Sequence, residues 1–167
     1  MGVSGSGKSS IAKSLAYSLQ FTFIEADDYH SSAAKQQMAN NQPLNDDMRK
    51  PWVAAIVNKL ELLYKNKKSV VLAFSGLKEQ HRNLLRETPF VCHFLYLTGE
   101  RDLLKARLLA RKNHFFSPEL LDSQFEAMES PLSTEKDVSL VDVNNDLETI
   151  LRQVKYIALN EFNKEVL

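Results

Sequence analysis

The chain opens on the stretch Met1-Gly2-Val3-Ser4-Gly5-Ser6-Gly7-Lys8-Ser9-Ser10. It fits the P-loop spacing G-x4-G-K-[ST], in which glycines let backbone N–H groups surround phosphate oxygens. Lys8 would bring a positive charge to the β- and γ-phosphates of a nucleotide, and the Ser9 hydroxyl could bind Mg²⁺. The alternative is a flexible glycine-rich N-terminus, which rarely has this spacing. The stretch predicts an ATP site made by Gly2, Gly5, Ser6, Gly7, Lys8, Ser9 and Ser10.

The segment before the P-loop is the unusual feature of the sequence. A P-loop normally follows a buried strand, and here Met1 alone stands before Gly2. If the chain truly begins at Met1, we expect a sheet that lacks this inner strand, and with it lower stability, a mobile or misplaced P-loop and weak ATP affinity. A start codon assigned too far downstream is the alternative explanation, and an in-frame apolar run of about five residues upstream would support it.

Composition restricts the class of protein. The 167 residues are 44% apolar and 25% charged, which is ordinary for one globular domain. The 21 basic and 21 acidic residues cancel, so no overall field attracts nucleic acid or an anionic membrane. We find no membrane-spanning run and no signal peptide, and we interpret the single Cys92 as a buried structural thiol. We therefore predict one cytoplasmic domain over residues 1–167 that binds neither nucleic acid nor membrane.

Hydrophobic periodicity alternates between helix and strand along the whole chain. Ile11, Leu15 and Leu19 recur at helical spacing, and the run 69–74 is typical of a strand buried on both faces. The predicted fold is α/β, a parallel sheet covered by helices, whose ligands bind where the strands end. The expected strands cover 21–25, 69–74, 90–97 and 138–143. The expected helices cover 9–20, 32–39, 47–65 with Asp46 as N-cap, 77–87, 102–112, a segment that starts at Ser117, and 147–158.

Acidic side chains follow the first predicted strand. Glu25, Asp27 and Asp28 stand where phosphoryl transfer needs a carboxylate to orient or deprotonate the accepting hydroxyl, and acids near Mg²⁺. A solvated turn is the alternative, and the adjacent P-loop favours the functional interpretation. His30, just beyond, more often bonds a backbone group than a substrate.

Basic side chains appear on two later segments. Arg49 has the planar fork that holds a carboxylate through two hydrogen bonds, although an exposed helix arginine is equally compatible. Lys78 and Arg82 recur at i, i+4 after the turn Ser75-Gly76, as part of a ligand site or of a solvated face.

A third basic segment precedes two aromatic residues. Arg107 and Arg111 lie before His114-Phe115-Phe116, a mixture that a mobile lid would explain. The alternative is a basic helix end that complements the helix dipole. The turn at Asn144-Asn145 is the expected place for adenine.

These runs together resemble the gluconate kinases, P-loop small-molecule kinases related to shikimate and adenylate kinases. The resemblance extends in family order from residue 2 to about residue 150. Beyond the P-loop, the runs that carry it are Asp27-Asp28-Tyr29-His30, Pro43-Leu44-Asn45-Asp46 with Arg49 and Pro51-Trp52, Ser75-Gly76-Leu77-Lys78 with Arg82 and Leu85-Arg86, Arg107-Leu108-x-x-Arg111-x-x-His114-Phe115, Leu120-Leu121-x-Ser123-Gln124-Phe125 with Glu129-x-Pro131, and Asp137-Val138.

The resemblance implies a three-layer α/β/α fold with a substrate-binding helical segment over about 29–65 and a helical lid over about 107–131. It implies transfer of phosphate from ATP, with Mg²⁺, to the terminal hydroxyl of D-gluconate, giving 6-phospho-D-gluconate. Family members are often homodimers, which we carry over as an expectation. The implied roles are catalysis for Lys8, Asp27 (base or orienter) and Arg111; nucleotide binding for the P-loop, Arg107 and Arg111; gluconate binding for Asp27, His30, Arg49, Lys78, Arg82 and Gln124; and Mg²⁺ binding for Ser9.

Some positions depart from the family pattern. Lys50 stands where a Trp is usual, Phe74-Ser75-Gly76 replaces Cys-Ser-Ala, Asn113 replaces a Gly and Phe116 a Met. These changes concern acceptor specificity and the lid and leave every charged role filled. Two alternatives to a gluconate kinase follow: a kinase for another acidic polyol such as shikimate, and a truncated nucleotide-binding protein of weak activity.

Overall fold

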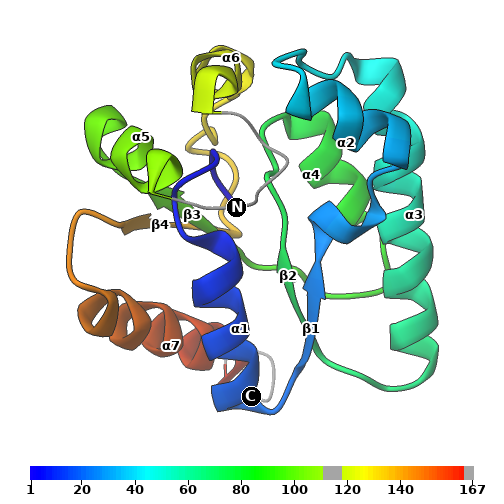
Figure 1. Cartoon of the computed structure of the whole chain (residues 1–167). Coiled ribbons are helices and arrows are strands. Elements are labelled where there is room, and N and C mark those ends of the chain that lie inside the picture. The colour runs from blue at the N-terminus through cyan, green and yellow to red at the C-terminus, as the bar shows by residue number, and fades with distance from the viewer. Residues whose placement is uncertain (111–117, 164–167) are drawn as a thin grey trace.

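The computed structural model describes residues 1–110 and 118–163, in which helices and parallel strands alternate (Figure 1). The strands are β1 (Thr22–Glu25), β2 (Val70–Ala73), β3 (Phe94–Thr98) and β4 (Val138–Asp142). The helices are α1 (Lys8–Leu19), α2 (Ser32–Ala39), α3 (Asp46–Lys65), α4 (Glu79–Arg86), α5 (Arg101–Leu109), α6 (Leu121–Ala127) and α7 (Leu147–Asn163), with the 3-10 helices η1 (Ala26–Tyr29) and η2 (Pro118–Leu120). This confirms the predicted α/β class with parallel strands.

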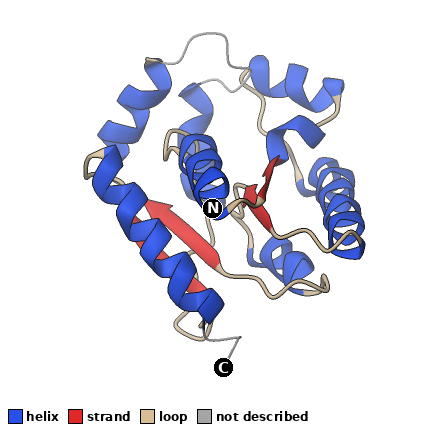
Figure 2. Ribbon diagram, turned by 90° about the horizontal axis from the view of Figure 1, so that it is seen from below, coloured by secondary structure: helices blue, strands red, loops and turns tan. Residues whose placement is uncertain are grey.

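The strands form two parallel pairs, β1 with β2 and β3 with β4. The N-terminus lies between the pairs in both views (Figures 1 and 2). The amino group of Met1 donates to Leu95 O at 2.6 Å, and Leu97 N–H donates to Met1 O at 2.9 Å, as in a parallel ladder. Gly2 N–H donates to Ser75 O, just beyond β2, at 2.9 Å. The first two residues thus connect the two strand pairs.

Apolar side chains pack in two clusters. One cluster joins α1, α5 and α7 to β3 and β4, through residues that include Leu15, Leu104 and Val154. The other joins α3 and α4 to β1 and β2 and includes Ile56 and Leu85. Because helices cover the strands on two sides, these strands can be apolar along their whole length, which is the pattern seen in the sequence.

Capping decides where the helices begin. Ser31 caps α2, because its hydroxyl accepts a hydrogen bond from Ala34 N–H at 3.1 Å. The prediction that Asp46 caps α3 is wrong, because Asn45 takes that position and its Oδ1 accepts from Met48 N–H at 2.9 Å. Asp46 is instead the first helical residue. Ser117, the predicted start of a further helical segment, lies outside the described residues.

The third strand starts at Phe94, later than the predicted residue 90. The preceding residues run back toward α4, where Cys92 is half-buried and its Sγ donates to Leu85 O at 3.4 Å. Burial raises the pKa of this thiol, which agrees with a structural role. None of the helices in the described residues is long and apolar enough to cross a membrane.

Candidate active site

The P-loop packs tightly against its neighbours. Gly5 has a φ of 84°, and a Cβ at this position would lie 2.5 Å from the carbonyl oxygen of Leu104. Only glycine fits both the backbone conformation and the space. Lys8 Nζ donates to Val3 O at 2.9 Å, which holds the lysine across the loop.

The serines of the P-loop have different surroundings. Ser6 is fully buried and its Oγ donates to Val3 O at 2.8 Å, so its side chain holds the loop together. Ser9 and Ser10 lie in the first turn of α1, whose positive dipole end faces the loop. Ser10 is exposed and Ser9 half-buried.

Glu25, the last residue of β1, lies beside the P-loop. Burial raises the pKa of its carboxyl group, while a hydrogen bond from the Ser9 side chain and the charge of Lys8 act in the opposite direction. Asp27 follows half-buried in η1, and Asp28 is exposed. The three acidic residues predicted as one cluster therefore have different surroundings, and Glu25 is the one that lies next to the phosphate-binding side chains.

His30 is held against an indole ring. Its ring stacks on Trp52 with centroids 4.3 Å apart and an interplanar angle of 11°. Trp52 Nε1 donates to Ala26 O at 2.7 Å, which fastens η1 to α3. Burial lowers the pKa of His30 to about 4, so the imidazole is neutral at pH 7 and offers one donor and one acceptor.

Asp46 brings two cations together. Its Oδ1 accepts from Arg49 Nη1 at 3.1 Å and its Oδ2 from Lys78 Nζ at 2.8 Å. These bonds, that of Lys78 first, lower the pKa of the Asp46 carboxyl group. Arg49 and Lys78 are only 18% and 24% exposed. Two cations and one carboxylate leave a partly buried site with one net positive charge, which suits an anionic ligand.

His81 is 5% exposed and lies near enough to this site for the charges of Arg49, Asp46 and Lys78 to act on it. Burial, and then the neighbouring charge of Arg49, lower its pKa. The histidine is therefore neutral at pH 7 and adds no charge to the two cations.

Arg82 belongs to a separate, buried network. Its guanidinium is fully buried and donates to both carboxylate oxygens of Glu135, at 2.9 and 2.8 Å. It also donates to Gly76 O at 3.1 Å and Glu129 O at 3.0 Å. Arg86 binds the same Glu135 carboxylate at 2.7 Å. These contacts favour a structural role for Arg82, which holds the 129–135 segment against the Ser75–Lys78 turn, over contact with a polyol.

Two other predicted site residues bind backbone groups. Gln124 on α6 accepts a hydrogen bond from the P-loop N–H of Ser4 at 2.6 Å. Arg107 Nη2 donates to Val143 O at 3.0 Å, in the turn where adenine is expected. Arg111, with His114 and the two following phenylalanines, lies outside the described residues.

One turn connects the phosphate side of the site to the anion side. Gly2 bonds to Ser75, and three residues later Lys78 bonds to Asp46. Asp27 and His30 approach from η1, where Asp27 raises and Arg49 lowers the pKa of His30, both after the larger effect of burial. The structure therefore brings the P-loop, η1 and the start of α3 to one region.

Sequence reasoning missed three residues of this region: Asp46 as a bridge between cations, His81, and Glu135. The spacing of Asp46 and Arg49 on one helix was a usable signal for their ion pair. Lys78, by contrast, is separated from Asp46 by 32 positions. No local pattern marks His81 or Glu135.

Known proteins resemble this chain over most of its length. An AAA domain family model matches residues 1–133. The thermoresistant gluconokinase of Escherichia coli (strain K12) is 40% identical over 151 residues, which cover 90% of this chain and 86% of that protein. The crystal structure of a gluconokinase from Sinorhizobium meliloti 1021 is 36% identical with a TM-score of 0.83, covering 98% of this chain and 94% of the other.

A third match is a crystal structure of a sugar kinase from Janibacter sp. HTCC2649. It is 32% identical with a TM-score of 0.86, over 92% of this chain and 88% of the other. The sequence identity to each of these proteins, and the fold shared with the two solved structures, extend over most of both chains. The chain therefore belongs to the gluconokinase family.

Proposed function

We propose that this protein transfers the γ-phosphoryl group of ATP to the terminal hydroxyl of D-gluconate, giving ADP and 6-phospho-D-gluconate. The observation that carries this function is the partly buried pair Arg49 and Lys78, bridged by Asp46 and joined to the P-loop through the Ser75–Lys78 turn. A sugar acid needs a cationic site at its carboxylate, and ATP needs the P-loop. The relatives named gluconokinases point to gluconate as that acid.

The phosphate side of the reaction rests on the P-loop. Its backbone N–H groups and the N-terminus of α1 would hold the β- and γ-phosphates, and Lys8 would neutralise the charge that develops on the transferring group. Ser9 and Glu25 offer neighbouring hard oxygen ligands, a donor set that fits Mg²⁺ bound together with phosphate oxygens. When bound, Mg²⁺ supplies charge neutralisation at those oxygens. Arg107 and Arg111 are the further nucleotide-binding residues that we propose.

The acceptor side rests on η1 and on the starts of α3 and α4. Asp27 would accept the proton of the gluconate hydroxyl as that oxygen bonds to the γ-phosphorus and the bond to ADP breaks. Arg49 and Lys78 would bind the carboxylate, and neutral His30 would hydrogen-bond a hydroxyl of the polyol. The contacts of Arg82 and Gln124 with protein groups leave both as weaker ligand candidates.

The organisation that we propose is one kinase domain with helices on both faces of the sheet. Residues 29–65 would form the substrate-binding segment and residues 107–131 the lid. Gln124 is part of that lid and already contacts the P-loop, so lid closure over ATP would act on the same N–H group. A homodimer remains an expectation from the family resemblance.

A substrate panel tests the proposal. ADP release from ATP and Mg²⁺ is measured with D-gluconate, shikimate and other aldonates, and the product is identified by 31P NMR. We expect turnover with gluconate above all others and a phosphomonoester on its terminal carbon. If another acid is phosphorylated faster than gluconate, the protein is a kinase for another acidic polyol. If ATP binds and no acid is phosphorylated, the alternative of a truncated nucleotide-binding protein of weak activity is supported.

A further inference from the structure

Lys78 occupies an unusual position for a lysine. It is the N-cap residue of α4, with a φ of −104° and a ψ of 140°, and its side chain makes no capping hydrogen bond. Ser, Thr, Asp and Asn are the usual N-caps, because their oxygens accept from the first free N–H groups of a helix. A lysine offers only donors, and its charge stands at the positive end of the helix dipole. A residue that breaks the local rules in this way needs compensation from another part of the fold.

Glu129 provides this compensation from a distant part of the chain. Its Oε2 accepts a hydrogen bond from the N–H of Glu79, the first residue of α4, at 2.6 Å and across 50 positions. A carboxylate at this place faces the positive end of the dipole, which is the favourable arrangement. The cap that Lys78 cannot form is therefore formed by Glu129.

Glu129 also bonds to the backbone on the other side of Lys78. Its own N–H donates to Leu77 O at 2.8 Å. Leu77 O belongs to the peptide unit before the Cα of Lys78, and Glu79 N–H belongs to the peptide unit after it. Because each peptide unit is planar and rigid, holding both units fixes φ and ψ of Lys78, and with them the direction in which its side chain leaves the backbone.

Arg82 holds Glu129 against the same turn. Its fully buried guanidinium donates through Nη1 to Glu129 O at 3.0 Å and to Gly76 O at 3.1 Å. The turn that leads into α4 is therefore held by Glu129 and Arg82 together.

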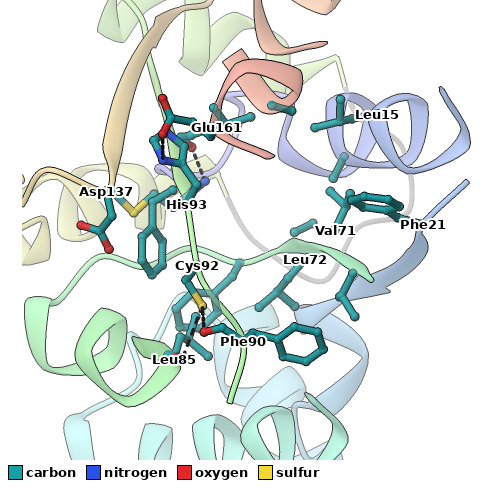
Figure 3. A pocket seen from close by; sticks show the side chains of 18 of the residues that line it. Leu15, Phe21, Val71, Leu72, Leu85, Phe90, Cys92, His93, Asp137 and Glu161 are labelled. Carbon is teal, nitrogen blue, oxygen red and sulfur yellow. Dashed lines mark hydrogen bonds and ion pairs between the residues drawn. The ribbon is translucent and has the colours of Figure 1, made fainter. Parts of the chain in front are cut away.

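The other end of α4 is anchored independently. Leu85 is 3% exposed, and its carbonyl oxygen accepts from Thr88 Oγ1 at 2.7 Å. Cys92 Sγ donates to the same oxygen at 3.4 Å (Figure 3). Leu85 and Cys92 also line an apolar cavity of about 470 Å³ between β2 and β3 (Figure 3). These contacts secure the C-terminal end of α4 and leave its first turn, with Lys78, dependent on Glu129.

We propose that Glu129 is a positioning residue of the acceptor site, which holds the backbone on both sides of Lys78 and thereby keeps the ammonium group where the carboxylate of the sugar acid binds. Lys78 Nζ lies 2.8 Å from Asp46 Oδ2 in this arrangement. Without Glu129 the first turn of α4 loses its cap, and the ammonium group spreads over several positions because the lysine stem is long and flexible. The inference rests on the proposed function, since it concerns the same anion site.

Two substitutions of Glu129 separate position from charge. Glu129→Gln keeps an oxygen that can accept from Glu79 N–H and removes a negative charge near the bound carboxylate, so the KM for gluconate should stay within about twofold of the parent value or fall. Glu129→Ala removes both the charge and the acceptor. It should raise the KM for gluconate at least about fivefold, while kcat and the KM for ATP stay within about twofold.

Thr88→Ala is the matched control, because it removes a hydrogen bond from the opposite end of α4. It should lower Tm and leave the KM for gluconate within about twofold of the parent value. Amide exchange of Glu79, measured without substrate, should be at least about tenfold faster in Glu129→Ala than in the parent chain or in Glu129→Gln. Equal exchange rates in the three proteins would overturn the proposal.

A double-mutant cycle tests whether Glu129 acts through Lys78. Lys78→Ala should raise the KM for gluconate, and adding Glu129→Ala to it should change that KM by less than about twofold. Effects that multiply independently would overturn the proposal, as would an equal KM for Glu129→Ala and the parent chain, or equal KM changes in Glu129→Ala and Glu129→Gln. The cycle uses the acid that the substrate panel selects, so a substrate other than gluconate overturns only the proposed function. These variant results in an active parent chain overturn only the role of Glu129.

Discussion

Replacing Arg82 with alanine is expected to lower the free energy of unfolding by about 3–5 kcal/mol. The fully buried guanidinium donates four hydrogen bonds, two to Glu135 and one each to the carbonyls of Gly76 and Glu129. Removal of one partner of a buried ion pair is costly because the other charge stays buried. Arg86 still binds Glu135 at 2.7 Å, which places the expected loss toward the lower end of this range.

Urea denaturation followed by the fluorescence of the single Trp52 measures this loss. The matched control is Arg101→Ala, because Arg101 and Asp122 form an exposed ion pair, 56% and 66% accessible, that contributes at most about 1 kcal/mol. Arg82→Lys keeps the positive charge but lacks the planar guanidinium, so its loss of unfolding free energy should lie between those of Arg82→Ala and Arg101→Ala. The KM for gluconate is measured on the same variants below their unfolding transitions.

If the free energy of unfolding of Arg82→Ala is within about 1 kcal/mol of that of the parent chain, the Arg82 network does not stabilise the fold and the structural interpretation is refuted. An unchanged unfolding curve together with a raised KM for gluconate would make Arg82 a substrate-binding residue, as the family resemblance implies. A stability loss with an unchanged KM would support the buried-network interpretation.

Three further outcomes are expected. Lys8→Ala should abolish turnover while the unfolding curve stays that of the parent chain, with Lys13→Ala as an active control; residual turnover at the control rate would remove Lys8 from the site. Arg49→Lys should raise the KM for gluconate about tenfold and leave the KM for ATP within about twofold, because lysine cannot form the two parallel hydrogen bonds that a guanidinium makes to a carboxylate. Equal effects on both KM values would contradict carboxylate binding by Arg49. Arg82 and Arg86 lower the pKa of Glu135 from its ordinary 4.5 to about 2, so its contribution to stability is complete above about pH 4.5 and is lost as the pH falls toward 2. Tm measured against pH should therefore fall less steeply in Glu135→Gln across this window, and identical slopes would contradict the assignment.

Local sequence was enough for features whose determinants lie close together in the chain. The P-loop was predictable because its glycines and Lys8 are contiguous and each has a local reason. The alternation of apolar runs predicted the four strands and their parallel arrangement, since strands buried on both faces differ from amphipathic ones. Errors were confined to ends, as at the start of α3, where Asn45 and Asp46 are both good caps and only the backbone decides between them.

The family and the candidate ligand-binding residues also came from sequence, because kinase motifs preserve residue types at fixed spacing. What the sequence did not determine is which charged groups bind each other. Helical spacing placed Lys78 and Arg82 on one face, but Lys78 reaches Asp46 while Arg82 is buried against Glu135. Those partners are separated by 32 and 53 positions, so only the folded chain selects them.

Tertiary structure likewise decided the setting of the opening residues. The sequence established a P-loop with Met1 alone before it. The fold showed where Met1 lies, bonded to β3 and lining an apolar cavity between the two strand pairs. Local sequence could not show this, because hydrogen bonds between parallel strands join residues that are far apart in the chain. The burial of a strand edge also depends on all the elements that pack around it. A motif therefore fixes which atoms can hold phosphate, and the surrounding sheet fixes how firmly the motif is held.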